Sequence, residues 1–567
     1  MANYNSAYTG SQIDGAIEKV IATELGKYNG VAQVIKITDA DTTLADIVEQ
    51  LIEVNTDGNY VFFDTSALNA NAYLCTISFD DFSNPSTYKM LDLVTTRVGN
   101  GFYSATMKLA DALRAMVEIG EDTTVYGARW DKTSAQMSRY GKAAGITTTT
   151  TNFTNNGSAN ENYDNPFDSI YPWSGRKLCN IDLPTYMSLE SGDSITDCVT
   201  AWEGDSGFSY NDPYGVWVYT PEFWGRAYDD DSYRYFEVSP NEQNGFVHYP
   251  ESIKGKWVGG VVKSLTIGGA SKECLLPTIG IPTGGSKSIG ALHTCAKNWG
   301  ATLDNRWTYD ATALLYIVEF ANYNVQSKLG SGVSDLYNES NTVTAVSGST
   351  LTASATSPAY IANAIIDIGS KQGTISAVDG TSITVDFELE ESDVGQAIKI
   401  HGMANYDDMM GSKSGYIGTN SKSHSYYRGE EFYGNMFTYI LGIYRDGATN
   451  HVWVASSPEE ADNYDALDKS VHLDTGITLA GTSGYVKSFG ISSARNLFAV
   501  PCCTEIGGSS SAPVGDYHYV NETTASRLLV VGGDAYYGAA CGFSGYWYVY
   551  SGNAFWDYVA RPNLLIP

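Results

Sequence analysis

The chain has 567 residues, and its 64 acidic against 34 basic residues give a formal net charge of −30 at pH 7. A field of this sign repels the phosphates of a nucleic acid, and no Lys/Arg cluster reverses it locally, so no nucleic acid partner is expected. No apolar stretch reaches the ~18 residues of a membrane span, so no membrane insertion is expected either.

Composition and length indicate a globular protein of several domains. Hydrophobic residues make up 43% and charged residues 17%, while 57 glycines against 16 prolines favour short strands and tight turns. The eight cysteines are scattered without a CxxC pair, and the seven histidines without an HExxH motif. We therefore expect reduced, mostly buried thiols, and neither a metal site nor a cofactor.

Residues 10–25 predict a short amphipathic helix. Ser11 and Asp14 form a candidate capping box, apolar residues recur at helical spacing, and Gly26 follows. A single helix of this length is marginal in water, so its apolar face would pack on a partner chain, on the next domain or elsewhere in its own chain. We assign residues 1–28 to docking or oligomerisation.

Residues 29–120 predict a small α/β module. The pattern favours strands at 31–37 and 60–64 and helices at 42–52 and 107–117. Because no glycine-rich phosphate loop is present, the expected role is structural or docking.

Three turn or loop motifs lie further along the chain. Residues 374–385 alternate around Asp379-Gly380, which predicts a β-hairpin within a small all-β insertion at 338–400. The run 229–231 of three aspartates between aromatic strands indicates a hairpin turn rather than an acid, a base or a calcium ligand. The glycine-serine run 507–511 lacks the P-loop pattern and predicts a plain loop.

Several motifs resemble tail proteins of phages and prophages of gut bacteria. These are YGARWD at 126–131, DSIYPWSG at 168–175 and LLYIVEFANYNVQSKLGSG at 314–332. Arg428-Gly429 with the GNMF run at 434–437 resembles the RG…GNVWEW signature of formylglycine-generating enzymes. The end, with RLLVVGG at 527–533, CGF at 541–543 and ARP at 560–562, resembles the variable region of retroelement-diversified proteins such as the major tropism determinant.

The resemblance covers roughly residues 125–567 and implies an α+β, strand- and loop-rich fold. Its main part would be a C-type-lectin-like (formylglycine-generating-enzyme-like) domain built from 121–337 and 401–567, with a variable-region-like end at 527–567. It would carry the β insertion and follow the α/β module and the N-terminal helix.

The same resemblance implies a non-enzymatic receptor-binding protein of the phage tail, located in the virion and acting at the host cell surface. Its partners would be a host receptor, either protein or glycan, and other tail or baseplate proteins that contact the N-terminal region. A homotrimer is the implied assembly.

The residues themselves also point to a binding surface at the C-terminal end. Residues 533–558 hold ten aromatics, with Asp, Ser, Gly, Ala and Val between them but no Lys, Glu, Gln or Met, as in antibody paratopes. Replacing the adenines of an Asn codon yields the same palette apart from Trp, which indicates retroelement diversification. The predicted ligand-binding residues are Asp534, Tyr536, Tyr537, Ala540, Tyr546, Tyr548, Tyr550, Phe555, Asp557 and Tyr558.

Within this stretch some aromatic residues are expected to be buried and others exposed. Trp547, Trp556 and Phe543 are expected in the core. The tyrosines are expected to be exposed, because each buried phenol needs a hydrogen-bond partner. Tyr546, Tyr548 and Tyr550 would then form a row on one face of an extended strand.

Other functions stay open at this point. A structural tail or baseplate component without receptor binding would fit the N-terminal module. A formylglycine-generating enzyme would need a reactive cysteine pair, but Cys502 and Cys503 are adjacent rather than a few residues apart, and Cys541 lies far along the chain. A polysaccharide-degrading enzyme would need two carboxylates whose spacing the sequence does not give. No catalytic residue is assigned.

Overall fold

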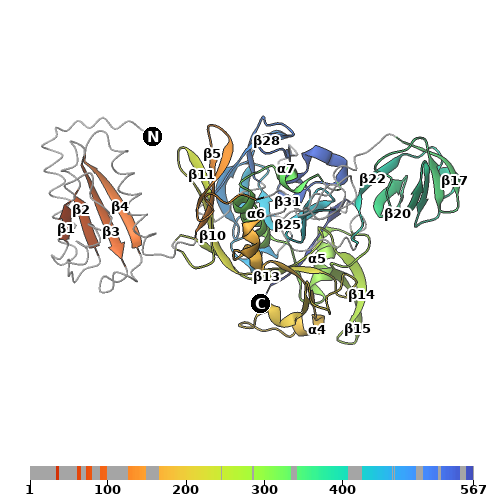
Figure 1. The fold of residues 1–567 in the computed structure, drawn as a ribbon, viewed down its shortest axis with the longest axis horizontal. Helices are drawn as coiled ribbons and strands as arrows, with labels where there is room; N and C mark the ends of the chain where they lie inside the picture. Colours follow the sequence, from red (N-terminus) through yellow and green to blue (C-terminus); the bar gives the residue numbers. More distant parts are fainter. Residues whose placement is uncertain are drawn as a thin grey trace. The chain divides into compact units, whose positions relative to one another are not determined.

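The chain divides into two compact units, Met1–Thr123 and Thr124–Pro567 (Figure 1). In this computed structural model the described residues are four strands of the first unit and most of 125–565. The gaps within the second unit are 149–164, 244, 284–286, 332, 334–340, 407–423, 463, 465–466, 493–501, 521–524 and 550–556.

The first unit contains a sheet in the order β1-β2-β3-β4. Strands β1 and β2 are parallel, and the following pairs are antiparallel. The strands are β1 (Gln33–Lys36), β2 (Tyr60–Asp64), β3 (Ala72–Phe79) and β4 (Met90–Val98). The two predicted strands, at 31–37 and 60–64, are therefore confirmed, while the predicted helices at 10–25, 42–52 and 107–117 lie outside the described residues.

The prediction of an α+β, lectin-like (formylglycine-generating-enzyme-like) fold is wrong. Residues 125–565 are 42% strand and 15% helix and form many small antiparallel sheets. Short runs of aromatic and β-branched residues separated by glycines at positive φ favour such hairpins over helices. The glycine-rich composition was the better guide here than the resemblance of the motifs.

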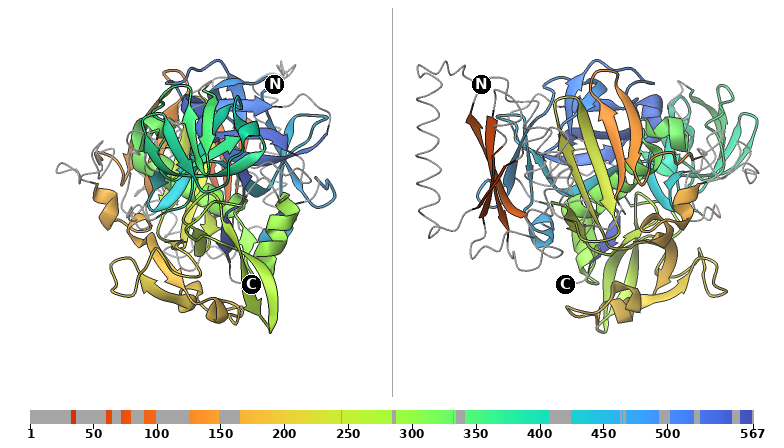
Figure 2. Two further views of the ribbon diagram at one scale, coloured as in Figure 1. Left: turned by 90° about the vertical axis from the view of Figure 1, so that its right-hand side faces the viewer. Right: turned by 60° about the vertical axis from the view of Figure 1, so that its left-hand side comes forward.

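Apart from the sheet of the insertion, the described part of the second unit contains three larger sheets. The first sheet runs β12-β10-β11-β5-β6, the second β16-β34-β13-β9-β7-β8, and the C-terminal sheet β27-β26-β25-β31-β32-β30-β28-β29 with β33 on β25. Hairpins β14–β15 and β23–β24 stand beside them, and Figure 2 shows α5 next to the first of these hairpins.

The first sheet is built from β5 (Tyr126–Asp131), β6 (Gln136–Gly141), β10 (Phe223–Asp229), β11 (Tyr233–Ser239) and β12 (Val247–Tyr249). The second contains β7 (Lys177–Ile181), β8 (Val199–Trp202), β9 (Trp217–Thr220), β13 (Ser252–Gly255), β16 (Thr302–Leu303) and β34 (Pro562–Leu564). The hairpins are β14 (Val261–Ile267) with β15 (Ala270–Leu276) and β23 (Ser425–Tyr427) with β24 (Glu430–Tyr433). The aspartate run 229–231 lies where β10 turns into β11, which confirms the predicted hairpin turn.

The C-terminal sheet is built from β25 (Phe437–Arg445), β26 (His451–Val454), β27 (Leu473–Thr478), β28 (Gly484–Phe489), β29 (Cys503–Ile506), β30 (Tyr517–Val520), β31 (Arg527–Gly532), β32 (Gly542–Val549) and β33 (Tyr558–Val559). Strand β31 is buried on both faces. Leu529 and Val531 belong to the core shared with α6, whereas Leu528 and Val530 belong to the core shared with α5.

The described helices are short, apart from α6. They are α4 (Leu183–Tyr186), α5 (Ile289–Lys297), α6 (Arg306–Phe320), α7 (Val325–Leu329) and α8 (Pro458–Ala461), with 3-10 turns η1 (Pro166–Ser169), η2 (Trp173–Gly175), η3 (Ile195–Cys198), η5 (Glu391–Asp393) and η7 (Ala535–Ala540). No helix among the described residues is long and apolar enough to cross a membrane.

Helix α6 packs between the first sheet and the C-terminal sheet (Figure 1). Asn305 and Thr308 form its capping box, and nearly every residue of the helix is buried. A helix surrounded in this way has no solvent-facing side, so its polar residues need partners inside the protein. It ends at Ala321, whose φ of 47° and ψ of 49° are left-handed.

The insertion forms a sheet of its own in the order β17-β18-β21-β20-β19-β22. Its strands are β17 (Val343–Ser347), β18 (Thr350–Ala353), β19 (Ala364–Ile368), β20 (Lys371–Asp379), β21 (Ser382–Val385) and β22 (Ile398–Met403). Strands β20 and β21 are antiparallel and join at Gly380, whose φ is 60°, which confirms the predicted hairpin. A separate hydrophobic core fills this module.

The C-terminal end and the interior of α6 give opposite expectations for an alanine-to-glycine substitution. Ala321→Gly should raise the free energy of unfolding by about 1 kcal/mol, because glycine adopts the left-handed conformation without the penalty that a Cβ imposes. Ala311→Gly, inside the same helix, should lower it by about 1 kcal/mol or more. Urea unfolding followed by circular dichroism measures both, and a shift of the same sign for both variants contradicts this reading of the helix end.

Candidate functional site

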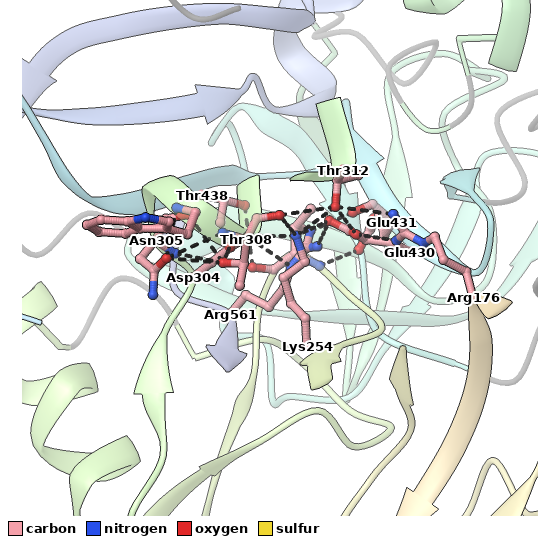
Figure 3. Close-up of polar contacts among 12 residues, drawn as sticks. Arg176, Lys254, Asp304, Asn305, Thr308, Thr312, Glu430, Glu431, Thr438 and Arg561 are labelled. Carbon is pink, nitrogen blue, oxygen red and sulfur yellow. Dashed lines mark hydrogen bonds and ion pairs between the residues drawn. The ribbon is translucent and has the colours of Figure 1, made fainter. Parts of the chain in front are cut away.

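A buried ionic network joins distant segments of the second unit. Figure 3 shows Arg176, Lys254 and Arg561 converging on Glu430 of β24. The Arg176 Nη2 and Lys254 Nζ atoms each lie 2.7 Å from a carboxylate oxygen, and all four side chains are at most 3% exposed. Thr312 of α6 donates a further hydrogen bond of 2.9 Å to Glu430.

Glu430 stays ionised in spite of its burial. Burial by itself would raise the pKa of Glu430, but the positive charges of Lys254, Arg561 and Arg176 outweigh it and lower the pKa to about 2. The carboxylate therefore holds together β13, the segment before β7 and the chain end at β34.

A second buried ion pair joins α6 to the β23–β24 turn. Arg428 donates two hydrogen bonds of 2.8 Å to the carboxylate of Glu319, and its guanidinium also lies 3.0 Å from Asp168. Tyr427 donates to Glu319 as well, at 2.8 Å. Three of the motifs that carried the family resemblance thus meet at this pair, where they serve the core.

The segment from residue 532 to 558, called the terminal segment below, begins and ends at one point of β25. Thr438 pairs with Val531 on one side and with Val559 on the other. The chain leaves the sheet after β31, re-enters it as β32 between β31 and β30, and returns beside β25 at β33. Both stems are fixed in the buried framework and β32 lies in the same sheet between them, so the part between β31 and β32, which contains η7, is an excursion from the sheet.

The turn that opens this excursion is held by backbone geometry and by α7. Gly533 has a φ of 73°, and a Cβ there would lie 2.7 Å from Cys541 Sγ, so no larger residue fits. Gln326 of α7 donates hydrogen bonds to the carbonyl oxygens of Gly538 and Cys541, at 3.1 and 2.9 Å. These contacts fix the 3-10 turn η7.

Aromatic rings from both stems of the terminal segment pack on Phe437. Tyr558 stacks on Phe437 with centroids 5.0 Å apart, and Tyr537 meets it edge-on at 5.3 Å. Phe437 and Tyr558 are buried, whereas Tyr537 is 39% exposed. Tyr537 is thus an exposed aromatic ring with a rigid base.

A histidine of the insertion module lies between two carboxylates beneath this surface. His401 Nε2 lies 3.2 Å from Asp367, and His401 Nδ1 lies 3.8 Å from Asp534. Burial works to lower the pKa of His401, but the hydrogen bonds and charges of both aspartates raise it above the usual value. Burial, followed by the charge of Asp534, raises the pKa of Asp557 to about 7.

The structure places the predicted binding residues in three groups. Tyr537, Ala540 and Asp557 are exposed or half-buried, whereas Asp534 and Tyr558 are buried, at 2% and 8% exposed. For Tyr558 the expected exposure is therefore wrong, because its ring stacks on Phe437. Tyr536, Tyr546 and Tyr548 have only their backbone described, in η7 and β32, while Tyr550 and Phe555 lie outside the described residues.

Strand β32 contains Tyr546 and Tyr548 at alternate positions, which confirms that this stretch is extended. The backbone of Trp547 belongs to the same strand, and Trp556 lies outside the described residues. Of the expected core residues, none has a described side chain, so their burial stays a prediction.

Sequence reasoning missed Phe437, Gln326, His401 and Asp367 as neighbours of the terminal segment. Nothing in the local pattern links a residue of the insertion to one more than a hundred positions later. An aromatic-rich stretch can be recognised from its composition, but a single glutamine or histidine cannot.

The described cysteines are free and buried, as expected. Burial raises the pKa of Cys502, Cys503 and Cys541, so none of these three is an activated thiol. Within the described residues no group of three or more His, Cys, Asp or Glu side chains is arranged to hold a metal ion.

No protein-family model matches the chain, and a search of curated proteins gives no match. The family resemblance drawn from the motifs therefore stays a hypothesis. A functional assignment has to be argued from the residues and their geometry.

The ionic network gives a stability prediction. Glu430→Gln should lower the free energy of unfolding by about 3–5 kcal/mol, because it leaves three buried cations with one carboxylate fewer. Glu273→Gln is the matched control, since Glu273 pairs with Lys287 at the surface and exposed pairs contribute less than about 1 kcal/mol. Urea unfolding measures the loss of unfolding free energy in both variants. Equal losses would mean that the buried carboxylate stabilises the protein no more than the exposed one.

Asp557 gives a pH-dependent prediction. Its folded pKa of about 7 lies above the unfolded value of about 3.9, so its contribution to stability is full at low pH and is lost as the pH rises towards 7. Asp557→Asn cannot ionise, and should therefore be more stable than the parent at pH 8 by roughly 1–3 kcal/mol, but not at pH 4.

Urea unfolding at pH 4, 6 and 8 measures this difference. Asp231→Asn, at an exposed turn position, serves as control and should show no pH-dependent gain. A gain for Asp557→Asn that is the same at all three pH values would contradict the assignment.

Proposed function

We propose that this chain is a receptor-binding protein of a phage tail and that its terminal segment contacts the host. In this proposal the binding is non-enzymatic, the N-terminal unit docks on other tail or baseplate proteins in the virion, and the assembly is a homotrimer. The host receptor is a protein or a glycan on the cell surface.

The observation that carries the proposal is the anchoring of the terminal segment at Thr438. Val531 and Val559 pair with the same residue of β25, and β32 pairs with β31 and β30, so backbone hydrogen bonds hold the segment at both ends and in its middle. Exposed side chains can therefore change while this framework is kept. Binding loops placed on a rigid scaffold have this organisation.

The chemistry of the segment supports the same function. Tyrosine provides a large contact area with few rotatable bonds, and Tyr537 is exposed while resting on a buried ring. Diversification by adenine replacement, also part of the proposal, would act on such exposed positions. Asp534 and Tyr558 would support the surface from beneath it.

Tyr537→Ala tests the proposal. Truncating an aromatic anchor at an interface typically costs ~2 kcal/mol, so binding of the purified protein to host cells should weaken about thirtyfold. Fluorescently labelled protein and flow cytometry on a panel of gut bacterial isolates give the affinity, and thermal unfolding shows whether the variant keeps its fold.

Met187→Ala is the matched control, because Met187 lies at the C-terminal end of α4, outside the terminal segment, and is 44% exposed. It should bind as the parent does. Parent-like binding by a folded Tyr537→Ala variant would place the adhesive surface elsewhere, and equal losses for both variants would indicate non-specific adhesion.

A further inference from the structure

A second candidate binding site lies apart from the aromatic cluster on Phe437. A cavity of about 620 Å³ opens between the β5–β6 hairpin, the connection from α6 to α7 and the loop that follows β29. This volume falls in the usual range for small-molecule sites, about 300–1,000 Å³. None of the ten residues predicted to bind ligand lines it.

The β5–β6 wall is fixed by its own turn. Asp131 accepts hydrogen bonds from the backbone N–H groups of Thr133 and Ser134, at 2.8 and 2.9 Å. Ser134 and Gln136 line the cavity with exposed side chains. These bonds fix the backbone of the turn that carries Ser134, and Gln136 follows as the first residue of β6.

The other two walls are tied to each other. Asn324 donates a 3.0 Å hydrogen bond to the carbonyl of Ser511, and Asn322 accepts one of 2.7 Å from the backbone of Asn324. Gly507 and Gly508 both donate to the carbonyl of Tyr485. These bonds hold the glycine-serine loop in place, so the cavity is formed before any ligand enters it.

The base of the cavity is aromatic. Trp130 and Tyr323 meet edge to face with centroids 5.0 Å apart, and both are nearly fully buried. The indole Nε1–H of Trp130 has no hydrogen-bond partner among the described residues, although a buried polar group normally finds one. That nitrogen has essentially no accessible surface, so this pair gives the cavity an apolar base and no donor that a ligand can reach.

The lining is almost entirely uncharged. Among the described residues around the cavity, the neutral polar side chains are Ser134, Gln136, Asn322, Asn324, Ser327, Ser509 and Ser511. Lys487 is the single charged residue of that lining, and it pairs with Glu505. A phosphate or carboxylate would find little compensation here, on a chain whose net charge is −30.

We infer that this cavity binds a neutral carbohydrate, one or two sugar units of a larger glycan. Sugar hydroxyls both donate and accept hydrogen bonds, which matches amide and hydroxyl side chains. The C–H face of a pyranose packs against aromatic and thioether groups such as those of Trp130 and Met137. This inference does not rest on the function proposed for the terminal segment.

Isothermal titration of the full chain with cellotriose, maltotriose, mannotriose and chitotriose tests the inference, with 3′-sialyllactose as an anionic comparison. At least one neutral trisaccharide should bind with a Kd below about 1 mM, and sialyllactose more weakly. Absence of binding by all four, or tighter binding of sialyllactose, overturns it.

Two variants locate the binding. Gln136→Ala should weaken it roughly threefold to tenfold by removing one hydrogen bond, and Ser134→Trp should abolish it by filling the cavity. Ser134 lies on the turn and Gln136 is the first residue of β6. Both are exposed, so the fold should persist, and Thr133→Ala on the same turn should bind as the parent does.

A third variant separates this site from the terminal segment. Tyr537→Ala should bind the trisaccharide unchanged even if it no longer binds cells. If Tyr537→Ala loses the sugar while Gln136→Ala and Ser134→Trp retain it, the carbohydrate site lies in the terminal segment and the inference is wrong.

Discussion

The structure of the second unit depends on keeping a buried carboxylate charged. Glu430 is inaccessible to water, and a lone ionised carboxylate in that position would be strongly unfavourable. It is tolerated because Arg176, Lys254 and Arg561 approach it from three segments that are far apart in sequence. The core is therefore complete only when the last residues of the chain have reached it.

This requirement explains where the chain end lies. Strand β34, just after Arg561, pairs with both β13 and β16, so the end of the chain forms an interior strand of the second sheet. Contacts between residues this distant in sequence form late and slowly, since the intervening chain must be ordered first. Once formed, they fix the return stem of the terminal segment as firmly as β31 fixes its departure.

The local sequence was sufficient to predict several turns and strands. The turn at Asp379-Gly380, the hairpin at the aspartate run 229–231 and the first two strands follow from residue preference and alternation alone. Helix α6 could not be predicted in this way, because it is buried on all sides and its polar residues Glu319 and Thr312 depend on partners in other elements. The motifs that suggested a resemblance include Glu319, but the fold class that they implied is wrong.

The candidate site was predictable in composition and not in geometry. Tyrosine enrichment pointed to residues 534–558, yet which rings face solvent depends on Phe437, a residue about a hundred positions earlier. Stacking on that ring buries Tyr558 and leaves Tyr537 exposed. The cavity lined by Trp130 could not be predicted from the sequence for the same reason, because its three walls come from segments that are far apart in the chain.

The insertion module limits how far the terminal segment can vary. Asp534 lies beside His401 of β22, and Ala535 belongs to the hydrophobic core of the module. A larger side chain at position 535 would push against that core, and loss of the charge at 534 would remove one of the two carboxylates beside His401. The first residues of η7 are therefore bound to the module as well as to the sheet. Tyr537 follows as the first described residue of η7 whose side chain is exposed, and its ring is held by its edge-on contact with Phe437.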